Sequence, residues 1–228
     1  MGFKIIAIDG PTGVGKSTIA RQLAGKLDCL YIDTGAMFRC LAWSWAAQGC
    51  LESDEFLVKL GDQTRIVFEN EKIICDDTDV TQKIRTEKIS AQASKISCFP
   101  SIREVMKKQQ RALVEEVRRS ENYQGVVLEG RDIGTVVFPA ADFKFYVDAS
   151  PEIRAKRRYL QLRESKEDAD YEKILTDLRK RDYQDQNRKI APLKPAEEAI
   201  IVNTSKLSAE DVLDYLLVRV AAEIGISQ

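Results

Sequence analysis

Near its N-terminus the sequence reads Gly10-Pro11-Thr12-Gly13-Val14-Gly15-Lys16-Ser17, which matches the pattern G-x-x-x-x-G-K-[ST]. The apolar run 3–8 before it predicts a buried strand, and residues 17–27 after it have the spacing of an amphipathic helix. In that setting, glycines let the backbone turn its N–H groups toward phosphate oxygens, and the helix start adds partial positive charge. The segment therefore predicts a site for the phosphates of a nucleoside triphosphate rather than a chance glycine-rich turn.

Each residue of this loop has an expected task. Lys16 should reach the β- and γ-phosphates, and the Ser17 hydroxyl should bind Mg²⁺. The cofactor expected here is Mg²⁺, with ATP as co-substrate. The expected ATP-binding residues are Gly10, Pro11, Thr12, Gly13, Val14, Gly15, Lys16, Ser17 and Thr18.

Short apolar strands alternate with helical segments along the rest of the chain. Further strands are expected near 30–32, 125–129, 143–148 and 199–202. This alternation predicts an α/β fold of the P-loop NTPase type, a parallel five-stranded sheet flanked by helices. One stretch departs from it, because 64–69 and 72–75 flank the polar Asn70-Glu71 and predict a hairpin within a β insertion at about 62–81.

Several helix limits are also expected. A helix should follow Gly35, another should span 82–97, and a third should begin with a capping box of Ser101 and Glu104. Ser150-Pro151 should open a helix, since proline suits the first helical position. Ser208 and Asp211 should cap the last one.

Composition excludes several classes of function. The 228 residues carry 35 Lys and Arg against 36 Asp and Glu, a net charge of -1, so no nucleic-acid partner is expected. The absence of histidine excludes Ser-His-Asp triads, Cys-His dyads and HExxH zinc sites. Five cysteines without a CxxC pair suggest free thiols in a reducing compartment. No apolar run reaches membrane-spanning length and no signal peptide is recognisable, so no membrane partner and a cytoplasmic location are expected.

The class of phosphate enzyme follows from missing motifs and from arginines. The sequence has no NKxD or DxxG motif of a GTPase and no LSGGQ-like signature of a transporter, which leaves small kinases. Arg39 and Arg131 both follow predicted strand ends, where ligands of open α/β sheets bind. Residues 151–190 hold twelve Lys and Arg against nine Asp and Glu, which suits a lid closing over phosphates.

For several charged residues, a structural and a functional role both stay open at this point. Residue by residue, most of 154–180 fits a solvated helix with salt-bridge partners better than a ligand site. Glu129 either holds a Mg²⁺-bound water or is merely a charge at a strand end, and we favour the water. For Arg131, which lies in a glycine-containing turn after a strand, a functional role is favoured.

Several segments together resemble the bacterial cytidylate kinases, a family of P-loop nucleoside monophosphate kinases. The resemblance runs from the first strand to the last helix, and its most specific part is Glu129-Gly130-Arg131-Asp132-Ile133-Gly134-Thr135-Val136-Val137-Phe138-Pro139. The other matching segments are 8–18, Asp33-Thr34-Gly35-Ala36-Met37-Phe38-Arg39, Ile84-Arg85-Thr86, Phe99-Pro100 with Arg103, Arg181-Asp182 with Asp185, Asn187-Arg188 and Ala191-Pro192-Leu193.

The resemblance implies transfer of the ATP γ-phosphate to CMP or dCMP by a monomeric enzyme. It also implies one kinase domain over 1–228, with a monophosphate-binding region at about 36–122 and a lid at about 154–185. The catalytic residues would be Lys16, Arg131, Arg181 and Arg188.

By the same resemblance, three arginines would hold the acceptor phosphate: Arg39, Arg131 and Arg188. Thr34 stands where the family often has Ser near the acceptor. The cytosine edge would be read by Ser94, Arg103 and Asp132, and the sugar would be held by Arg181 and Asp185. Cytosine offers a 4-amino donor beside the acceptors N3 and O2, so a carboxylate and a guanidinium or hydroxyl can pair with it.

The sequence shows three departures. Ser17 follows the loop lysine where several nucleotide kinases have Gly, although Ser is the general form of the phosphate loop. Glu129 stands where the family often has Asp, so the side chain on the metal side of the site is longer by one methylene group. Phe38 stands near a position where the family often has Tyr.

Three other functions remain as alternatives. One is a P-loop kinase of another nucleoside monophosphate or of a shikimate-like acceptor, another is a non-catalytic nucleotide-binding regulator, and the third is a nucleic-acid-binding ATPase.

Overall fold

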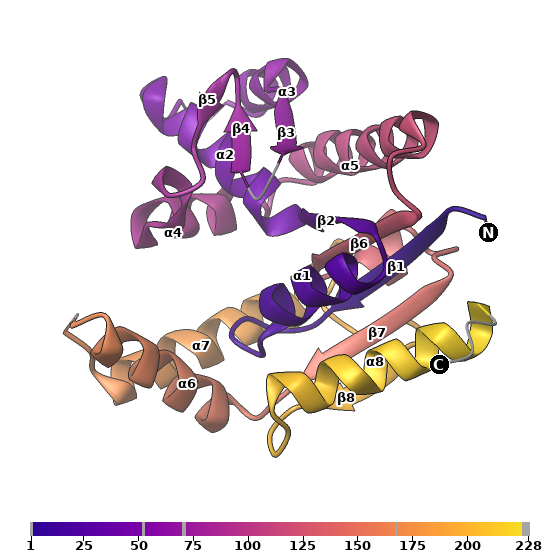
Figure 1. The fold of residues 1–228 in the computed structure, drawn as a ribbon. Helices are drawn as coiled ribbons and strands as arrows, with labels where there is room; N and C mark the ends of the chain where they lie inside the picture. Colours follow the sequence, from indigo (N-terminus) through magenta and orange to yellow (C-terminus); the bar gives the residue numbers. More distant parts are fainter. Residues whose placement is uncertain (1, 52, 70–71, 167, 225–228) are drawn as a thin grey trace. The chain divides into compact units, whose positions relative to one another are not determined.

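The computed structural model describes residues 2–51, 53–69, 72–166 and 168–224. The chain forms two compact units (Figure 1). Unit 1 comprises residues 1–31 and 117–228, and unit 2 comprises residues 32–116.

Unit 1 is built on a five-stranded parallel sheet with the strand order β2-β6-β1-β7-β8. This confirms the expected α/β fold. The strands are β1 (Lys4–Asp9), β2 (Cys29–Asp33, whose last residues enter unit 2), β6 (Gly125–Gly130), β7 (Phe143–Asp148) and β8 (Ile200–Asn203). The helices are α1 (Lys16–Lys26), α6 (Pro151–Glu164), α7 (Tyr171–Gln186) and α8 (Ala209–Ile224).

Apolar packing of helices on the sheet forms the core of unit 1. Ile6 and Ile8 of β1 and Phe145 of β7 share one buried cluster with Leu23 of α1 and Leu216 of α8. Helices α1 and α8 contact each other and lie along the same face of the sheet (Figure 1). Burying an apolar side chain of this size stabilises the fold by about 1.5–3 kcal/mol, which fixes the strands on which the site depends.

The strand register places the carboxyl ends of several strands at one edge of the sheet. Asp9 pairs with Gly130 of β6 and with Tyr146 of β7, while Asp148 pairs with Asn203 of β8. The segments that follow β1, β6, β7 and β8 therefore begin side by side. Ligand sites of open α/β sheets form at this carboxyl edge.

Unit 2 joins helices to a small antiparallel sheet of order β3-β4-β5. Its helices are α2 (Thr34–Ala47), α3 (Asp54–Gln63), α4 (Glu87–Ile96) and most of α5 (Pro100–Ser120), and its strands are β3 (Ile66–Glu69), β4 (Lys72–Cys75) and β5 (Thr78–Asp79). The β3–β4 pairing confirms the predicted hairpin, whose turn residues Asn70-Glu71 lie outside the described residues. The sequence analysis did not identify the short strand β5.

Two predicted helix starts are wrong. Residues 82–97 do not form one helix, because Thr86 is extended and its Oγ1 accepts a hydrogen bond from Ile89 N, which starts α4 anew after a 3₁₀ turn at Lys83–Arg85. The predicted capping box of Ser101 and Glu104 does not form, because α5 already begins at Pro100. The Ser101 hydroxyl instead donates to Asp54, and Glu104 pairs with Lys107.

The helix expected after Gly35 begins one residue before it, at Thr34, because the Asp33 side chain accepts a hydrogen bond from Ala36 N and caps it. Two other expected helix starts agree with the structure. Ser150 caps α6, which begins at Pro151. Ser208 and Asp211 bond reciprocally at the start of α8: Ser208 N donates to the Asp211 carboxylate, and Asp211 N donates to Ser208 Oγ. No helix in the described part of the chain is long and apolar enough to cross a membrane.

Candidate active site

The predicted phosphate loop connects β1 to α1 and lies within unit 1. Two of its glycines have backbone conformations that a side chain would disturb. A Cβ on Gly10 would lie 2.0 Å from the carbonyl oxygen of Val147, and Gly15 caps α1 with a φ of 95°. The loop thus packs directly on β7 and turns sharply into the helix, whose first N–H groups favour an anion.

Lys16 is buried beneath this loop, with 5% of its surface exposed. Its Nζ donates to the carbonyl oxygens of Gly10 and Pro11 at 2.8 and 2.7 Å. Burial and the charge of Arg131 lower the pKa of Lys16 to about 7, against the opposing effect of nearby carboxylates. A phosphate beside Lys16 would favour its charged form, so binding of an anion and protonation of this amine are linked.

Asp9 joins the end of β1 to the segment that follows β6. Its carboxylate accepts hydrogen bonds from Ile133 N at 2.8 Å and Gly134 N at 2.7 Å. Burial raises the pKa of Asp9 to about 6, although both backbone bonds oppose this change. The contact fixes the turn that carries Arg131 and Asp132 beside the phosphate loop.

Glu129 and Ser17 are the candidate residues on the metal side of the loop. Glu129 is buried at the end of β6 and accepts a hydrogen bond from the Tyr31 hydroxyl, whose ring packs against the Arg21 guanidinium. Ser17 is exposed in the first turn of α1. The described residues contain no group of three or more His, Cys, Asp and Glu suited to a metal ion. Hydroxyl and carboxylate oxygens are nevertheless the donors that Mg²⁺ prefers, and it retains several waters and phosphate oxygens as ligands.

Arg131 extends from the end of β6 to the phosphate loop. Its Nη2 donates to Thr12 Oγ1, and its Nε donates to Asp185 Oδ2 of α7 at 2.9 Å. Arg188 Nη2 lies 3.3 Å from the other oxygen of Asp185. Burial raises the pKa of Asp185, but Arg131 and Arg188 outweigh it, so that pKa lies below its usual value.

Five predicted residues of unit 1 therefore influence one another through contacts or charge: Lys16, Arg131, Arg181, Asp185 and Arg188. Asp132 follows Arg131 and is buried. The cluster lies on the phosphate loop, just after β6, and on α7 and the segment that follows it, and it concentrates positive charge beside the phosphate loop. Such an arrangement suits ligands with more than one phosphate group.

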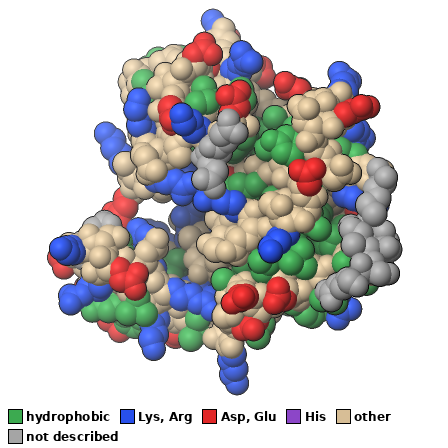
Figure 2. Space-filling view, in the orientation of Figure 1, with side chains coloured by type: hydrophobic (Ala, Val, Ile, Leu, Met, Phe, Trp, Pro, Cys, Tyr) green, Lys and Arg blue, Asp and Glu red, His purple; other side chains and the backbone are tan. Residues whose placement is uncertain are grey.

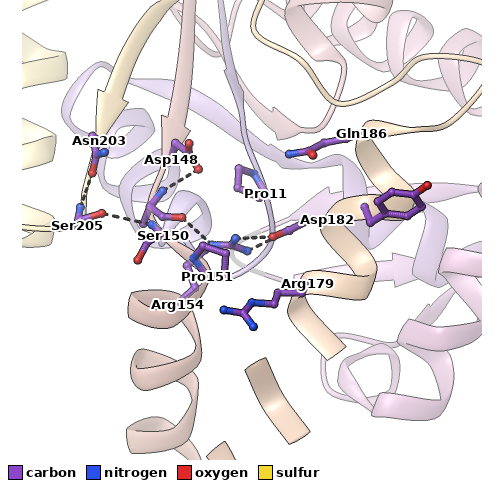
Figure 3. Close-up of a pocket in the computed structure, with 12 residues that line it drawn as sticks. Pro11, Asp148, Ser150, Pro151, Arg154, Arg179, Asp182, Gln186, Asn203 and Ser205 are labelled. Atoms are coloured by element: carbon purple, nitrogen blue, oxygen red, sulfur yellow. Dashed lines mark hydrogen bonds and ion pairs between the residues drawn. The ribbon is translucent and has the colours of Figure 1, made fainter. Parts of the chain in front are cut away.

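A pocket of about 520 Å³, also within unit 1, is bordered by Pro11 of the loop (Figure 3). It lies between the ends of β7 and β8 and the helices α6 and α7. Its lining residues are Pro11, Asp148, Ala149, Ser150, Pro151, Arg154, Arg179, Asp182, Tyr183, Gln186, Asn203 and Ser205. Its size falls within the usual range for small-molecule sites.

The remaining predicted acceptor residues belong to unit 2. Thr34 is buried at the start of α2, and Arg39 Nη2 donates to Asp33 Oδ2 at 2.7 Å. The Nε of Arg39 is buried and has no hydrogen-bond partner among the described residues. Arg103 lies over the Phe38 ring, 5.8 Å from its centre, whereas Ser94 on α4 is half-buried. Unit 2 thus pairs Arg39 with Asp33 and Arg103 with Phe38.

The sequence analysis missed four polar residues at or beside this site: Asp9, Tyr31, Arg154 and Asp182. Arg154 falls in the stretch interpreted as solvated helix, but only 2% of its surface is exposed. Asp182 belongs to one of the segments that match the family, but the sequence alone assigns it no role. The available signals were the position of Asp9 next to the loop and the position of Arg154 one turn after Pro151.

Comparisons with known proteins identify the family of the chain. The profile of the family described as "Cytidylate kinase" matches residues 6–222. A curated protein from Aeromonas hydrophila named cytidylate kinase is 39% identical to this chain. The match covers 97% of this chain and 95% of the length of that protein. A second protein of that name, from Nitratidesulfovibrio vulgaris (strain Hildenborough), is 41% identical. That match covers 98% of this chain and 95% of the length of the relative. The crystal structure of TT1252 from Thermus thermophilus is similar over 98% of both chains, with a TM-score of 0.49 and 20% identity.

Proposed function

The chain belongs to the cytidylate kinase family, and on that premise we propose that it transfers the γ-phosphoryl group of ATP to CMP and dCMP. The products are CDP or dCDP together with ADP. The alternative of a kinase for a different small acceptor is not favoured by the family.

The contact between Arg131 and Thr12 carries the proposal. One guanidinium extends from the turn after β6, the most specific part of the resemblance, to the loop expected to hold the donor phosphates. A cation in that position can neutralise charge on a phosphoryl group passing between donor and acceptor. Phosphoryl transfer depends chiefly on such positioning and charge stabilisation.

The donor side combines the phosphate loop with the neighbouring pocket. Backbone N–H groups of the loop and the Lys16 ammonium bind the ATP phosphates, and the 520 Å³ pocket accommodates the nucleoside part. The Asn203 and Ser205 side chains at the end of β8 offer polar atoms to a base. Since Pro11 belongs to both loop and pocket, one ligand can occupy them together.

Mg²⁺ fits the oxygen donors present, with Ser17 as direct ligand and Glu129 acting through water. When bound, the ion neutralises charge on the β- and γ-phosphate oxygens. Tyr31 orients the Glu129 carboxylate by donating to it. Glu129 also favours the charged form of Lys16, against burial and Arg131.

On the acceptor side, Arg39, Arg131 and Arg188 hold the α-phosphate. Support comes from the buried Nε of Arg39, a donor that an anion would satisfy. Thr34 lies near the acceptor, and Ser94, Arg103 and Asp132 read the cytosine. Arg181 and Asp185 hold the sugar. The pKa of Asp185 lies below its usual value, so its carboxylate is ionised and accepts hydrogen bonds from sugar hydroxyls.

We assign acceptor recognition to the region at about 36–122 and lid function to about 154–185, and both regions belong to one kinase domain.

The enzyme acts as a monomer in the cytoplasm, and nucleic acid is not a partner. The net charge of -1 supports this last assignment, and the face in Figure 2 shows Lys and Arg interspersed with Asp and Glu.

Product analysis tests the proposed chemistry. ATP, CMP and Mg²⁺ should give CDP and ADP in equal amounts when the mixture is separated by chromatography and identified by mass. ADP formation without CDP would point to ATP hydrolysis and contradict phosphoryl transfer to CMP.

A further inference from the structure

Arg154 is a buried cation, with 2% of its surface exposed. It lies in the first turn of α6 and lines the pocket, and Figure 3 shows its guanidinium directed at Asp182. A buried guanidinium destabilises a protein unless its N–H groups are paired. The identity of its partners therefore indicates what it does.

The Arg154 guanidinium connects three segments of unit 1. Its Nε donates to Ala149 O at 2.9 Å, just after β7. Its Nη1 donates to Asp182 Oδ1 and to Thr12 O, both at 3.0 Å, and its Nη2 donates to Asp182 Oδ2. The fork-to-fork pair with Asp182 fixes the guanidinium plane, and that plane directs one N–H at the carbonyl of Thr12.

The Thr12 carbonyl controls the next donor of the phosphate loop. In a trans peptide the C=O of one residue and the N–H of the next point in opposite directions. Holding Thr12 C=O on Arg154 therefore directs Gly13 N–H away from Arg154. The Arg154 stem also passes close to Gly13, because a Cβ placed on Gly13 would come within van der Waals contact of the Arg154 Cβ, at 3.5 Å.

Thr12 is joined to α7 twice. Asp182 reaches its carbonyl through Arg154, and Asp185, one helical turn further on, reaches its hydroxyl through Arg131. We propose that Asp182, acting through Arg154, is a positioning residue that orients the Thr12–Gly13 peptide of the phosphate loop for binding the donor phosphates. This rests on the proposed function, because it assumes that the loop binds the phosphates of ATP.

A role limited to joining α6 to α7 explains the pair less well. The two helices already share the cluster of Ala155, Leu175 and Leu178 and an edge-on contact between Tyr159 and Tyr171. A second ion pair, Arg179 with Glu152 at 2.7 Å, also links them at the surface. Glu152 is the matched control, since among the described residues it pairs with Arg179 and not with the loop, and it does not line the pocket.

The test is calorimetric binding of two probes, ADP and inorganic tripolyphosphate, without acceptor. Tripolyphosphate has no base or sugar, so it separates loop orientation from contacts with the nucleoside. We expect Asp182→Asn to weaken both probes at least tenfold and by similar factors. Glu152→Gln should change neither affinity by more than twofold.

Two results would overturn the proposal. If Asp182→Asn weakens ADP but not tripolyphosphate, the pair contacts the nucleoside and does not orient the loop. If it weakens neither, Arg154 needs no help from Asp182. If Asp182→Asn fails to fold, Asp182→Glu is tested instead. We expect it to bind tripolyphosphate at least threefold more weakly. Unchanged binding of tripolyphosphate would contradict the proposed role of Asp182. Turnover of CMP by the unaltered protein, measured separately, reports on the proposed function itself.

Discussion

Arg131 and Asp185 form an ion pair in which Nε lies 2.9 Å from Oδ2. The pair joins the turn after β6 to α7, and it leaves Nη2 of the same guanidinium on the Thr12 hydroxyl. A carboxylate assigned to the acceptor's sugar thus orients an arginine assigned to the acceptor's phosphate. The two assignments make different predictions when either partner is removed.

Arg131→Ala should remove charge stabilisation from the transferring phosphoryl group. Arginines in this role contribute about 10³-fold or more to phosphoryl transfer, equivalent to several kcal/mol of transition-state stabilisation. We expect kcat/KM for CMP to fall by that order in steady-state assays. Arg219→Ala removes an exposed arginine of α8 and should leave the rate unchanged. An unaltered rate in Arg131→Ala would be incompatible with the assigned role.

Asp185→Ala should weaken use of the acceptor in two ways. It removes a sugar contact and also frees Arg131 from the bond that orients it. We expect a higher KM for CMP together with a lower kcat, measured by varying CMP at saturating ATP. Asp177→Ala, an exposed position on the same helix, is the control. The assignment fails if both constants for CMP match those of the unaltered protein.

Lys16 should link nucleotide binding to proton uptake. Its pKa is lowered to about 7, so at pH 8 the amine is mostly neutral in the free protein, whereas phosphate oxygens beside it favour the charged form. ADP binding at pH 8 should therefore take up close to one proton, and at pH 6 Lys16 should contribute almost none because it is already charged. Calorimetry in two buffers of different ionisation enthalpy measures this uptake.

Lys16→Arg is the matched variant for that experiment. Arginine stays protonated at both pH values, so the uptake at pH 8 should disappear even if binding is weaker. Equal proton uptake by the two proteins would show that another group titrates.

Sequence patterns of short range predicted most of the fold. The phosphate loop, its flanking strand and helix, and the strands β6 and β7 all follow from local spacing. The helix predicted over 82–97 failed because the Thr86 side chain competes for the backbone N–H of Ile89, a local effect that periodicity does not record. The capping box failed because Pro100 already supplies the helix start.

The connections within the site were less accessible to sequence. Asp9 bonds to Ile133 and Gly134, which lie 124 and 125 residues away, and Arg154 bonds to Asp182 across 28 residues. Such pairs depend on strand order and helix packing, which no motif specifies. Arg131 could be singled out because it follows a strand end, where ligands of open α/β sheets bind. The role assigned to each site residue stays a prediction.

Acceptor selectivity is the most direct test of CMP and dCMP as the acceptors. ADP release should be measured with ATP and Mg²⁺ against CMP, dCMP, UMP, AMP, GMP and shikimate at equal concentrations. We predict fast turnover of CMP and dCMP, weak turnover of UMP and none of the others above the rate without acceptor. Turnover confined to another acceptor would leave the fold and the phosphate loop intact but contradict the assigned function and every acceptor-site assignment.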